Sequence, residues 1–192
     1  MLRLLTNNII KGLGMKSLVI YKSKTGFTKK YAEWIAEKLS ADLYDYSQIN
    51  KELFKGYDVV IYGGSLHAVG IEGIKLIKDN LNILKGKKVV IFAVGASPFR
   101  EETVEEVKNN NFSKEQLEQI QFYYLRGGFN YNKLPFFDKL LMKLLQWKLK
   151  RKKVLTVDEK GMLNAYQEPA DFTRKENIDG IVAYAGSSEN KL

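Results

Sequence analysis

A strand that runs directly into a hydroxyl-rich turn constrains this chain more than any other feature. Residues 18–21 are an apolar run, and Ser23, Thr25 and Thr28 surround Gly26 just before a helical pattern. Hydroxyl groups, a glycine that lets backbone come close, and the free N–H groups of a helix N-terminus together suit a phosphate. The patterns Gly-x-x-x-x-Gly-Lys-Ser/Thr and Gly-x-Gly-x-x-Gly are missing, so the turn favours a monophosphate over a nucleoside triphosphate or a dinucleotide. The alternative is an ordinary turn whose hydroxyls only cap the helix.

Strand-type runs alternate with helical patterns along the rest of the chain, which predicts an α/β fold with a parallel sheet. The predicted strands cover residues 17–21, 42–45, 59–62, 88–94 and 121–125, and the predicted helices cover about 28–39, 72–83 and a stretch from 101 onward. Three of these strands end in loops of small and hydroxylic residues. Because the carboxyl ends of parallel strands share one edge of a sheet, we expect the loops to converge on one ligand. Their residues are the candidate cofactor contacts: Ser23, Lys24, Thr25, Gly26, Phe27 and Thr28; Gly64, Ser65, Leu66, His67 and Ala68; Gly95, Ala96, Ser97, Pro98 and Phe99.

The composition limits the number of domains and the kinds of site. A chain of 192 residues with 45% hydrophobic residues is expected to fold as one domain. It has no cysteine and one histidine, which excludes thiolate and multi-histidine metal sites, and we expect no structural metal. Residues 1–14 precede a natural start at Met15, and we interpret them as an N-terminal extension; a terminal helix packed on the domain is the alternative.

The hexapeptide at residues 23–28 resembles the signature of the flavodoxin family, in which a strand leads into Thr/Ser-x-Thr-Gly-x-Thr around the phosphate of FMN. The resemblance implies a flavodoxin-like FMN-binding domain over residues 15–192. Its doubly wound sheet would have five parallel strands in the order 2-1-3-4-5, helices on both faces and a helical insertion before the last helix. The second and third loops would hold the isoalloxazine ring. Many flavodoxins resemble one another in placing Trp and Tyr there, whereas this chain has Leu66-His67 and Ser97-Pro98-Phe99, so we expect different stacking. His67 is interpreted as a loop or flavin contact, with a proton relay as the alternative.

Residues 126–172 form a longer connection than a minimal domain of this kind needs, and such loops are usually functional. Within it, residues 135–150 predict a basic amphipathic helix. Three interpretations stay open: a helix packed on its own domain, attachment to an anionic membrane surface helped by Trp147 and the basic residues 150–153, or nucleic-acid binding. No base-reading motif accompanies the helix, so no nucleic-acid partner is expected. Its predicted apolar face comprises Phe137, Leu140, Leu141, Leu144, Leu145 and Leu149, with Lys139, Lys143 and Lys150 opposite.

The sequence Phe136-Phe137-Asp138-Lys139, continuing to Leu145, is similar to the corresponding segment of the quinone-dependent protoporphyrinogen oxidase family. That resemblance implies FMN-dependent oxidation of a porphyrinogen in haem biosynthesis, with electrons passed to menaquinone at the membrane. The second loop, at residues 66–68, lacks the arginine and tyrosine expected for that family. The alternative is a flavodoxin-like electron-transfer or regulatory FMN-binding protein that docks on a protein partner.

The formal net charge of +9 helps to separate these two functions. Electron-carrying flavodoxins resemble one another in being acidic, whereas a basic protein suits an anionic substrate or membrane. We therefore expect a small-molecule substrate, with a quinone or other redox partner. Because the sequence shows neither a membrane-length apolar stretch nor a secretory leader, we expect a cytoplasmic location, peripheral on the inner face of the membrane. No catalytic acid or base can be assigned. The candidate substrate contacts are Arg126, Lys133 and Arg100.

Overall fold

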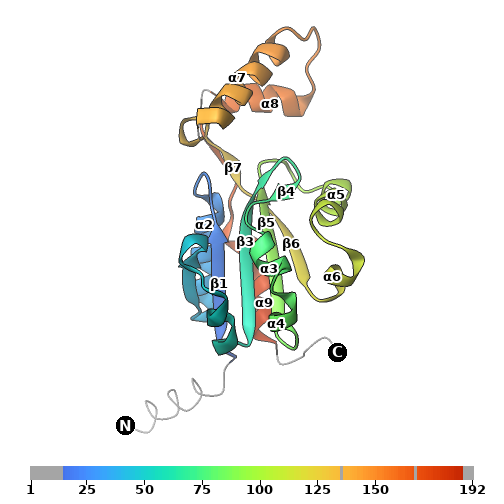
Figure 1. The fold of residues 1–192 in the computed structure, drawn as a ribbon. Helices are drawn as coiled ribbons and strands as arrows, with labels where there is room; N and C mark the ends of the chain where they lie inside the picture. Colours follow the sequence, from blue (N-terminus) through green and yellow to red (C-terminus); the bar gives the residue numbers. More distant parts are fainter. Residues whose placement is uncertain (1–14, 135, 167, 188–192) are drawn as a thin grey trace, which may run out of the picture.

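The computed structural model describes residues 15–134, 136–166 and 168–187, so the predicted extension at 1–14 lies outside the described residues. A parallel sheet in the order β2-β1-β3-β5-β6 forms its centre (Figure 1), which confirms the predicted strand order. A short strand, β4, pairs antiparallel with the end of β3. The strands are β1 (Ser17–Lys22), β2 (Asp42–Asp45), β3 (Val59–His67), β4 (Gly70–Ile71), β5 (Lys88–Gly95) and β6 (Gln121–Arg126).

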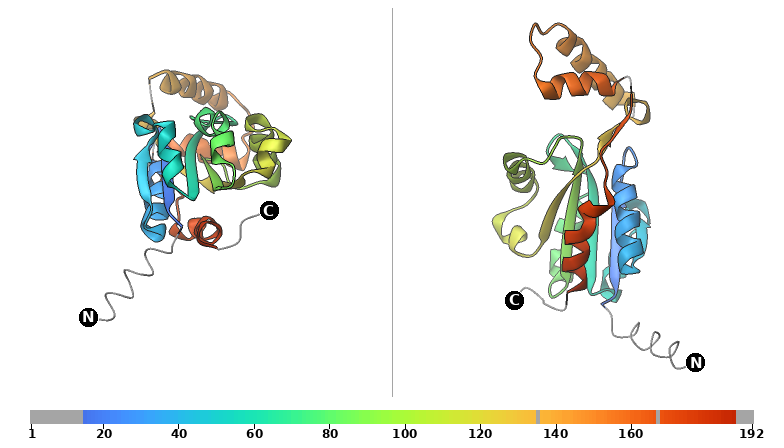
Figure 2. Two further views of the ribbon diagram at one scale, coloured as in Figure 1. Left: turned by 60° about the horizontal axis from the view of Figure 1, so that its bottom comes forward. Right: turned by 180° about the vertical axis from the view of Figure 1, so that it is seen from behind.

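Helices cover both faces of the sheet because the central strands are apolar on both sides. On one face, α2 (Phe27–Leu39) and α9 (Asp179–Gly186) lie side by side, as Figure 2 shows from behind. The other face is covered by α3 (Lys75–Lys78), α4 (Leu81–Leu84), α5 (Glu101–Asn111) and α6 (Lys114–Glu118). The described residues also form the 3₁₀ helices η1 (Tyr46–Gln48), η2 (Lys51–Gly56), η3 (Tyr131–Lys133) and η4 (Lys175–Ile178).

The single helix predicted over residues 72–83 is wrong, because this segment forms the two short helices α3 and α4. Gly73 has a φ of +73°, which delays the start of the first helix. Asn80 leaves the helical region at φ −118° and ψ 11°, and its side-chain amide donates to the Leu76 carbonyl at 2.8 Å. An asparagine that bonds backbone in this way competes with a continuous helix.

The long segment after β6 leaves the sheet at its carboxyl edge and returns to the same place. Its two stems, β7 (Gly128–Phe129) and β8 (Ala170–Asp171), pair antiparallel and carry α7 (Phe136–Lys150) and α8 (Val157–Ala165) beyond the ends of the strands (Figure 1). The Phe172 N–H donates to the Gly127 carbonyl at 2.8 Å, so the two ends of this insertion, residues 128–171, meet. The helix α7 was predicted, whereas β7, β8 and α8 were not.

Candidate cofactor site

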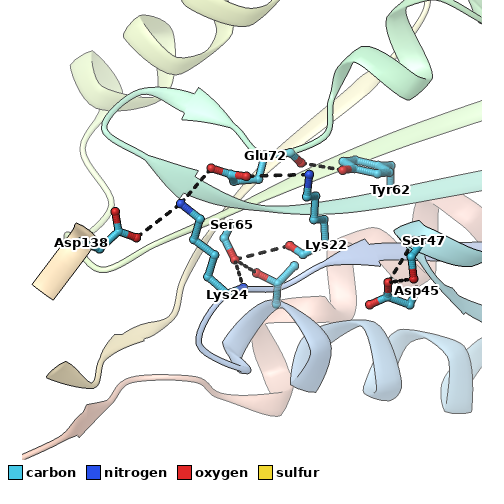
Figure 3. Close-up of polar contacts among 9 residues, drawn as sticks. Lys22, Lys24, Asp45, Ser47, Tyr62, Ser65, Glu72 and Asp138 are labelled. Atoms are coloured by element: carbon cyan, nitrogen blue, oxygen red, sulfur yellow. Dashed lines mark hydrogen bonds and ion pairs between the residues drawn. The ribbon is translucent and has the colours of Figure 1, made fainter. Parts of the chain in front are cut away.

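The hydroxyl of Ser65, near the end of β3, holds the first loop (residues 23–28) in shape. Ser65 Oγ accepts a hydrogen bond from the backbone N–H of Lys24 at 3.3 Å and lies 2.9 Å from Thr28 Oγ1 (Figure 3). It also lies 3.4 Å from the carbonyl oxygen of Lys22, at the end of β1. Both Ser65 and Thr28 are buried. The Thr28 hydroxyl, which was expected near a phosphate, therefore bonds the Ser65 hydroxyl of the second loop, and the pair supports the first loop.

The N-terminus of α2 opens onto this loop without a side-chain cap. Gly26 occupies the N-cap position with a φ of +96°, in the left-handed region that glycine adopts without strain. No side chain caps the helix, and its first turn has no acidic residue. An anion here would accept hydrogen bonds from the free amides and meet the positive end of the helix dipole. Ser23 Oγ accepts from the Gly26 N–H at 3.1 Å and closes the turn, so these residues fit the terminal phosphate of FMN.

The three predicted loops converge on one cleft at the carboxyl edge of the sheet. Its volume of about 200 Å³ is below the several hundred Å³ of sites that enclose a ligand, so part of a bound FMN would remain in solvent. The predicted residues that line the cleft are Lys24, Thr25, Phe27, Thr28, Ser65, Leu66, His67, Gly95 and Ala96. Ser23, Gly26, Gly64, Ala68, Ser97, Pro98 and Phe99 belong to the same loops but are not among its lining residues.

The third loop is braced by β6 instead of presenting an aromatic ring to the cleft. The Tyr124 hydroxyl donates to the Ser97 carbonyl at 2.9 Å, and burial raises the pKa of Tyr124. Phe99 packs edge-on against Tyr124, with ring centroids 6.4 Å apart, and its side chain is 62% exposed. The different flavin stacking expected from the sequence therefore stays a prediction.

The three candidate substrate cations lie near this end of the molecule but do not line the cleft. Arg126 Nε donates to the Ala96 carbonyl at 3.4 Å, and its guanidinium stacks 3.7 Å above the ring of Phe172. Arg100 lies immediately before α5, and Lys133 is exposed in η3. Their role in substrate binding stays a prediction.

An ionic cluster joins the first two loops to the insertion at the mouth of the cleft. Lys24 Nζ lies 3.1 Å from Glu72 Oε1 and 3.5 Å from Asp138 Oδ2 (Figure 3). His67 Nε2 lies 3.6 Å from Asp138 Oδ1. Burial alone would lower the pKa of Lys24, but the hydrogen bond and charge of Glu72, with those of Asp138, outweigh burial and raise it. Lys24 therefore stays charged at neutral pH.

Several residues of the site could not be assigned from sequence. The inner turn of α7 brings Asp138 and Met142 to the cleft, and the Gly128–Phe129 stem lies beside them. Asp138 stands one helical turn before Met142, and Leu145 and Leu149 continue this row, a spacing that marks one helix face. If this row is taken as the face of α7 that points toward the domain, it places Asp138 at the site. The cleft residues outside the predicted set are Val94, Gly128, Phe129, Asn130, Leu134, Asp138, Leu141 and Met142.

Comparison with known proteins identifies the family. Residues 18–156 match the model of a flavodoxin domain. The chain belongs to the flavodoxin domain family. A flavodoxin from Maridesulfovibrio salexigens is 35% identical over 98 residues, which are 44% of this chain and 66% of that flavodoxin. The family, together with the uncapped turn at the end of β1, makes FMN the cofactor that the cleft accommodates.

A second relative is similar over most of the chain. Protoporphyrinogen IX dehydrogenase [quinone] from Escherichia coli K12 is 22% identical over 185 residues, which cover 85% of this chain and 99% of that enzyme. Among solved structures, the two-electron reduced flavodoxin of Megasphaera elsdenii matches with a TM-score of 0.43 at 17% identity, covering 62% of this chain and 88% of that one. In the described part of the chain, no group of three or more His, Asp or Glu side chains could hold a metal ion.

Proposed function

We propose that this flavodoxin-domain protein is an FMN-dependent oxidoreductase that oxidises a porphyrinogen-like substrate and passes the electrons to a quinone. The observation that carries the proposal is the insertion, whose helix α7 contributes Leu141 and Met142 to the same cleft as the cofactor loops. A protein that only carries electrons needs an exposed flavin edge, whereas an apolar wall beside the cofactor gives a substrate a place to bind. The similarity to the E. coli dehydrogenase over 85% of the chain supports the proposal.

Bound FMN would supply a two-electron acceptor, and the chain would supply binding, orientation and exclusion of water. The free amides at the start of α2 and the Thr25 hydroxyl would hold the phosphate. Phe129, Leu134 and Met142 would form an apolar wall that keeps water from the reacting edge and packs against a macrocycle. Arg126, at the rim beside the third loop, would attract the carboxylates of an acidic substrate.

The outer face of α7 supports docking on a membrane surface. Phe136, Phe137, Leu140, Leu144 and Trp147 are between 50% and 76% exposed. Only the inner side of the predicted apolar face packs: Leu149 is buried and Leu145 is half-buried. The helix α7 therefore packs on its own domain along one edge only, and an exposed apolar patch like the one that remains marks an interaction surface.

Basic residues continue this apolar face at the end of α7. The Arg151 guanidinium stacks 3.7 Å above the ring of Trp147, and Lys148, Lys150 and Lys153 are exposed around it. Lysines and arginines near an anionic surface contribute about 1 kcal/mol each, which adds to the burial of apolar side chains at the interface. None of the helices in the described ranges is long and apolar enough to cross a membrane. We propose that α7 lies in the plane of an anionic membrane surface, on its cytoplasmic side.

Anaerobic turnover of protoporphyrinogen IX by the FMN-loaded protein, with a quinone and detergent or lipid present, tests the enzymatic proposal. We expect quinone-dependent oxidation. The Arg126→Gln variant should raise KM more than it lowers kcat, because a rim cation contributes to substrate and transition-state binding alike. A protein that binds FMN fully but oxidises no porphyrinogen under these conditions would instead be a flavodoxin-like electron-transfer or regulatory protein.

Vesicle flotation tests the membrane proposal. Wild-type protein should float with anionic vesicles, and less so as salt rises, since exposed charges are screened within about 8 Å at physiological ionic strength. Replacing residues 150–153 by Gln should abolish flotation without loss of FMN. The matched control replaces four other exposed lysines, Lys51, Lys75, Lys85 and Lys114, by Gln and changes the net charge equally. Equal flotation of the two variants, or indifference to lipid charge, would refute the membrane proposal.

A further inference from the structure

Asp138 in the first turn of α7 occupies the point where three separate segments meet. Its Oδ2 lies 3.5 Å from Lys24 Nζ of the first loop, and its Oδ1 lies 3.6 Å from His67 Nε2 at the end of β3. Lys24 is also paired with Glu72, which follows β4. The Asp138 side chain is only 17% exposed, although α7 is otherwise a largely exposed helix. One carboxylate therefore bridges both cofactor loops to the insertion, and Figure 3 shows its contact with Lys24.

The other polar contacts of α7 do not reach the cofactor loops. The Tyr166 hydroxyl donates to the Met142 carbonyl at 2.6 Å, and the Tyr131 hydroxyl donates to the Lys139 carbonyl at 3.5 Å. Both tyrosines belong to the insertion itself and pack against one another. Within the described residues, the recorded ion pairs between α7 and the cofactor loops all run through Asp138. The helix is thus fixed to its own stem by tyrosines and to the sheet by this one charged side chain.

The position of α7 decides how closed the cleft is. Leu141 and Met142, on the turn that follows Asp138, line the cleft opposite the first loop. We propose that Asp138 is a positioning residue that seats α7 on the two cofactor loops and thereby slows the release of bound FMN. The claim about FMN release rests on the assignment of FMN as the cofactor. It does not depend on the proposed substrate or quinone.

The ionic cluster explains why a carboxylate is suited to this position. Lys24 would keep Glu72 as a partner without Asp138, but His67 has no other recorded partner among the described residues. Both contacts to Asp138 are longer than the 2.7–2.9 Å typical of charge-assisted hydrogen bonds. Partly exposed pairs of this kind each contribute little to stability, so we expect the contact between α7 and the loops to open when FMN enters or leaves.

The test compares Asp138→Asn, which keeps the shape and removes the charge, with Asp138→Glu, which restores the charge. The matched control is Glu159→Gln, since Glu159 is also a carboxylate of the insertion with a lysine partner, Lys152 at 2.7 Å, but does not line the cleft. We expect the FMN dissociation rate to rise about 2- to 5-fold in Asp138→Asn, the range for loss of the partly exposed Lys24–Asp138 ion pair. It should return toward the wild-type rate in Asp138→Glu and stay unchanged in the control.

A distance measurement on the protein without FMN tests whether Asp138 holds α7 in place. The chain has no cysteine, so Lys38→Cys on α2 and Lys143→Cys on α7 introduce two unique sites for spin labels. The label-to-label distance distribution of the protein without FMN should broaden in Asp138→Asn and in His67→Gln, and stay narrow in the control. An unchanged distance distribution in Asp138→Asn would refute the claim that Asp138 holds α7 against the cofactor loops, whatever substrate the protein oxidises. A broadened distance distribution with an unchanged FMN dissociation rate would refute the claim that this contact of Asp138 slows FMN release.

Discussion

The role of Ser65 as the support of the first loop makes a quantitative prediction. Its hydroxyl bonds the Lys24 amide at 3.3 Å and the Thr28 hydroxyl at 2.9 Å, in a buried position. Each net hydrogen bond stabilises a protein by about 0.5–1.5 kcal/mol, and a buried donor left unpaired costs somewhat more. We expect Ser65→Ala to lower the free energy of unfolding of the protein without FMN by about 1–3 kcal/mol.

Thr25→Ala is the comparison, because Thr25 lines the same cleft and no hydrogen bond of its hydroxyl is recorded within the described chain. Loss of the Thr25 hydroxyl should change the free energy of unfolding by less than about 0.5 kcal/mol. If its hydroxyl binds the phosphate, FMN affinity should fall by about 1.5–3 kcal/mol, the range for hydrogen bonds to charged groups. The Ser65 variant should lose both stability and affinity, because the loop it supports is no longer held in shape.

Urea denaturation followed by circular dichroism measures the first quantity, and isothermal titration calorimetry with FMN measures the second. With a urea dependence of about 2 kcal/mol/M, the Ser65→Ala midpoint should fall by about 0.5–1.5 M. A Ser65→Ala midpoint equal to that of the wild type would refute the supporting role. Unchanged FMN affinity in Thr25→Ala would show that this hydroxyl does not bind the phosphate.

Three further predictions concern backbone and charge. Gly26→Ala should lower stability by about 1–2 kcal/mol, measured by urea denaturation, because its φ is +96°. Gly128→Ala should separate β7 from β8, since a Cβ there would lie 2.1 Å from a carbonyl oxygen of β8; faster proteolysis of the insertion would report it. Burial raises the pKa of Asp171, but hydrogen bonds from Lys30 and Thr173 outweigh burial and lower it. The stability that this carboxylate contributes is therefore present above its ordinary pKa of 3.8 and lost as pH falls below it. The urea midpoint should thus fall more between pH 5 and pH 3 in the wild type than in Asp171→Asn, by a small amount because Asp171 is half exposed.

The centre of the sheet could be predicted because β1, β3 and β5 each contain a short, continuous apolar run, and such runs are buried on both faces in a parallel sheet. Residues 59–62 and 88–94 lie in β3 and β5, which the structure extends to His67 and Gly95. Convergence of the loops then follows from topology, since parallel strands all end at one edge. The hydroxyl-rich turn at residues 23–28 could be found for a different reason. Its backbone needs a glycine at position 26, and three hydroxyl side chains so close to a helix start are typical of a phosphate site.

The insertion was harder to predict because its apolar residues are not confined to one face. The periodicity identified α7 but could not tell which part of its wide apolar arc packs inward, and the packed side proved to be the edge that carries Leu145 and Leu149. Asp138 and Glu72 are ordinary acidic residues in sequence, and they become part of the site only when distant segments meet. The two-residue strands β7 and β8 are shorter than any pattern that periodicity can detect.

The hydrogen bond between Phe172 and Gly127 has a consequence for how the molecule folds. It closes the base of the insertion, so the chain on either side continues as though residues 128–171 were absent. The sheet and its covering helices, including α9, which packs against α2, can then assemble before the insertion is ordered. Closing so long a loop adds little entropic cost per extra residue, because that cost grows only logarithmically with length. We therefore expect the sheet and the insertion to unfold as two cooperative units, with the cofactor cleft at their boundary.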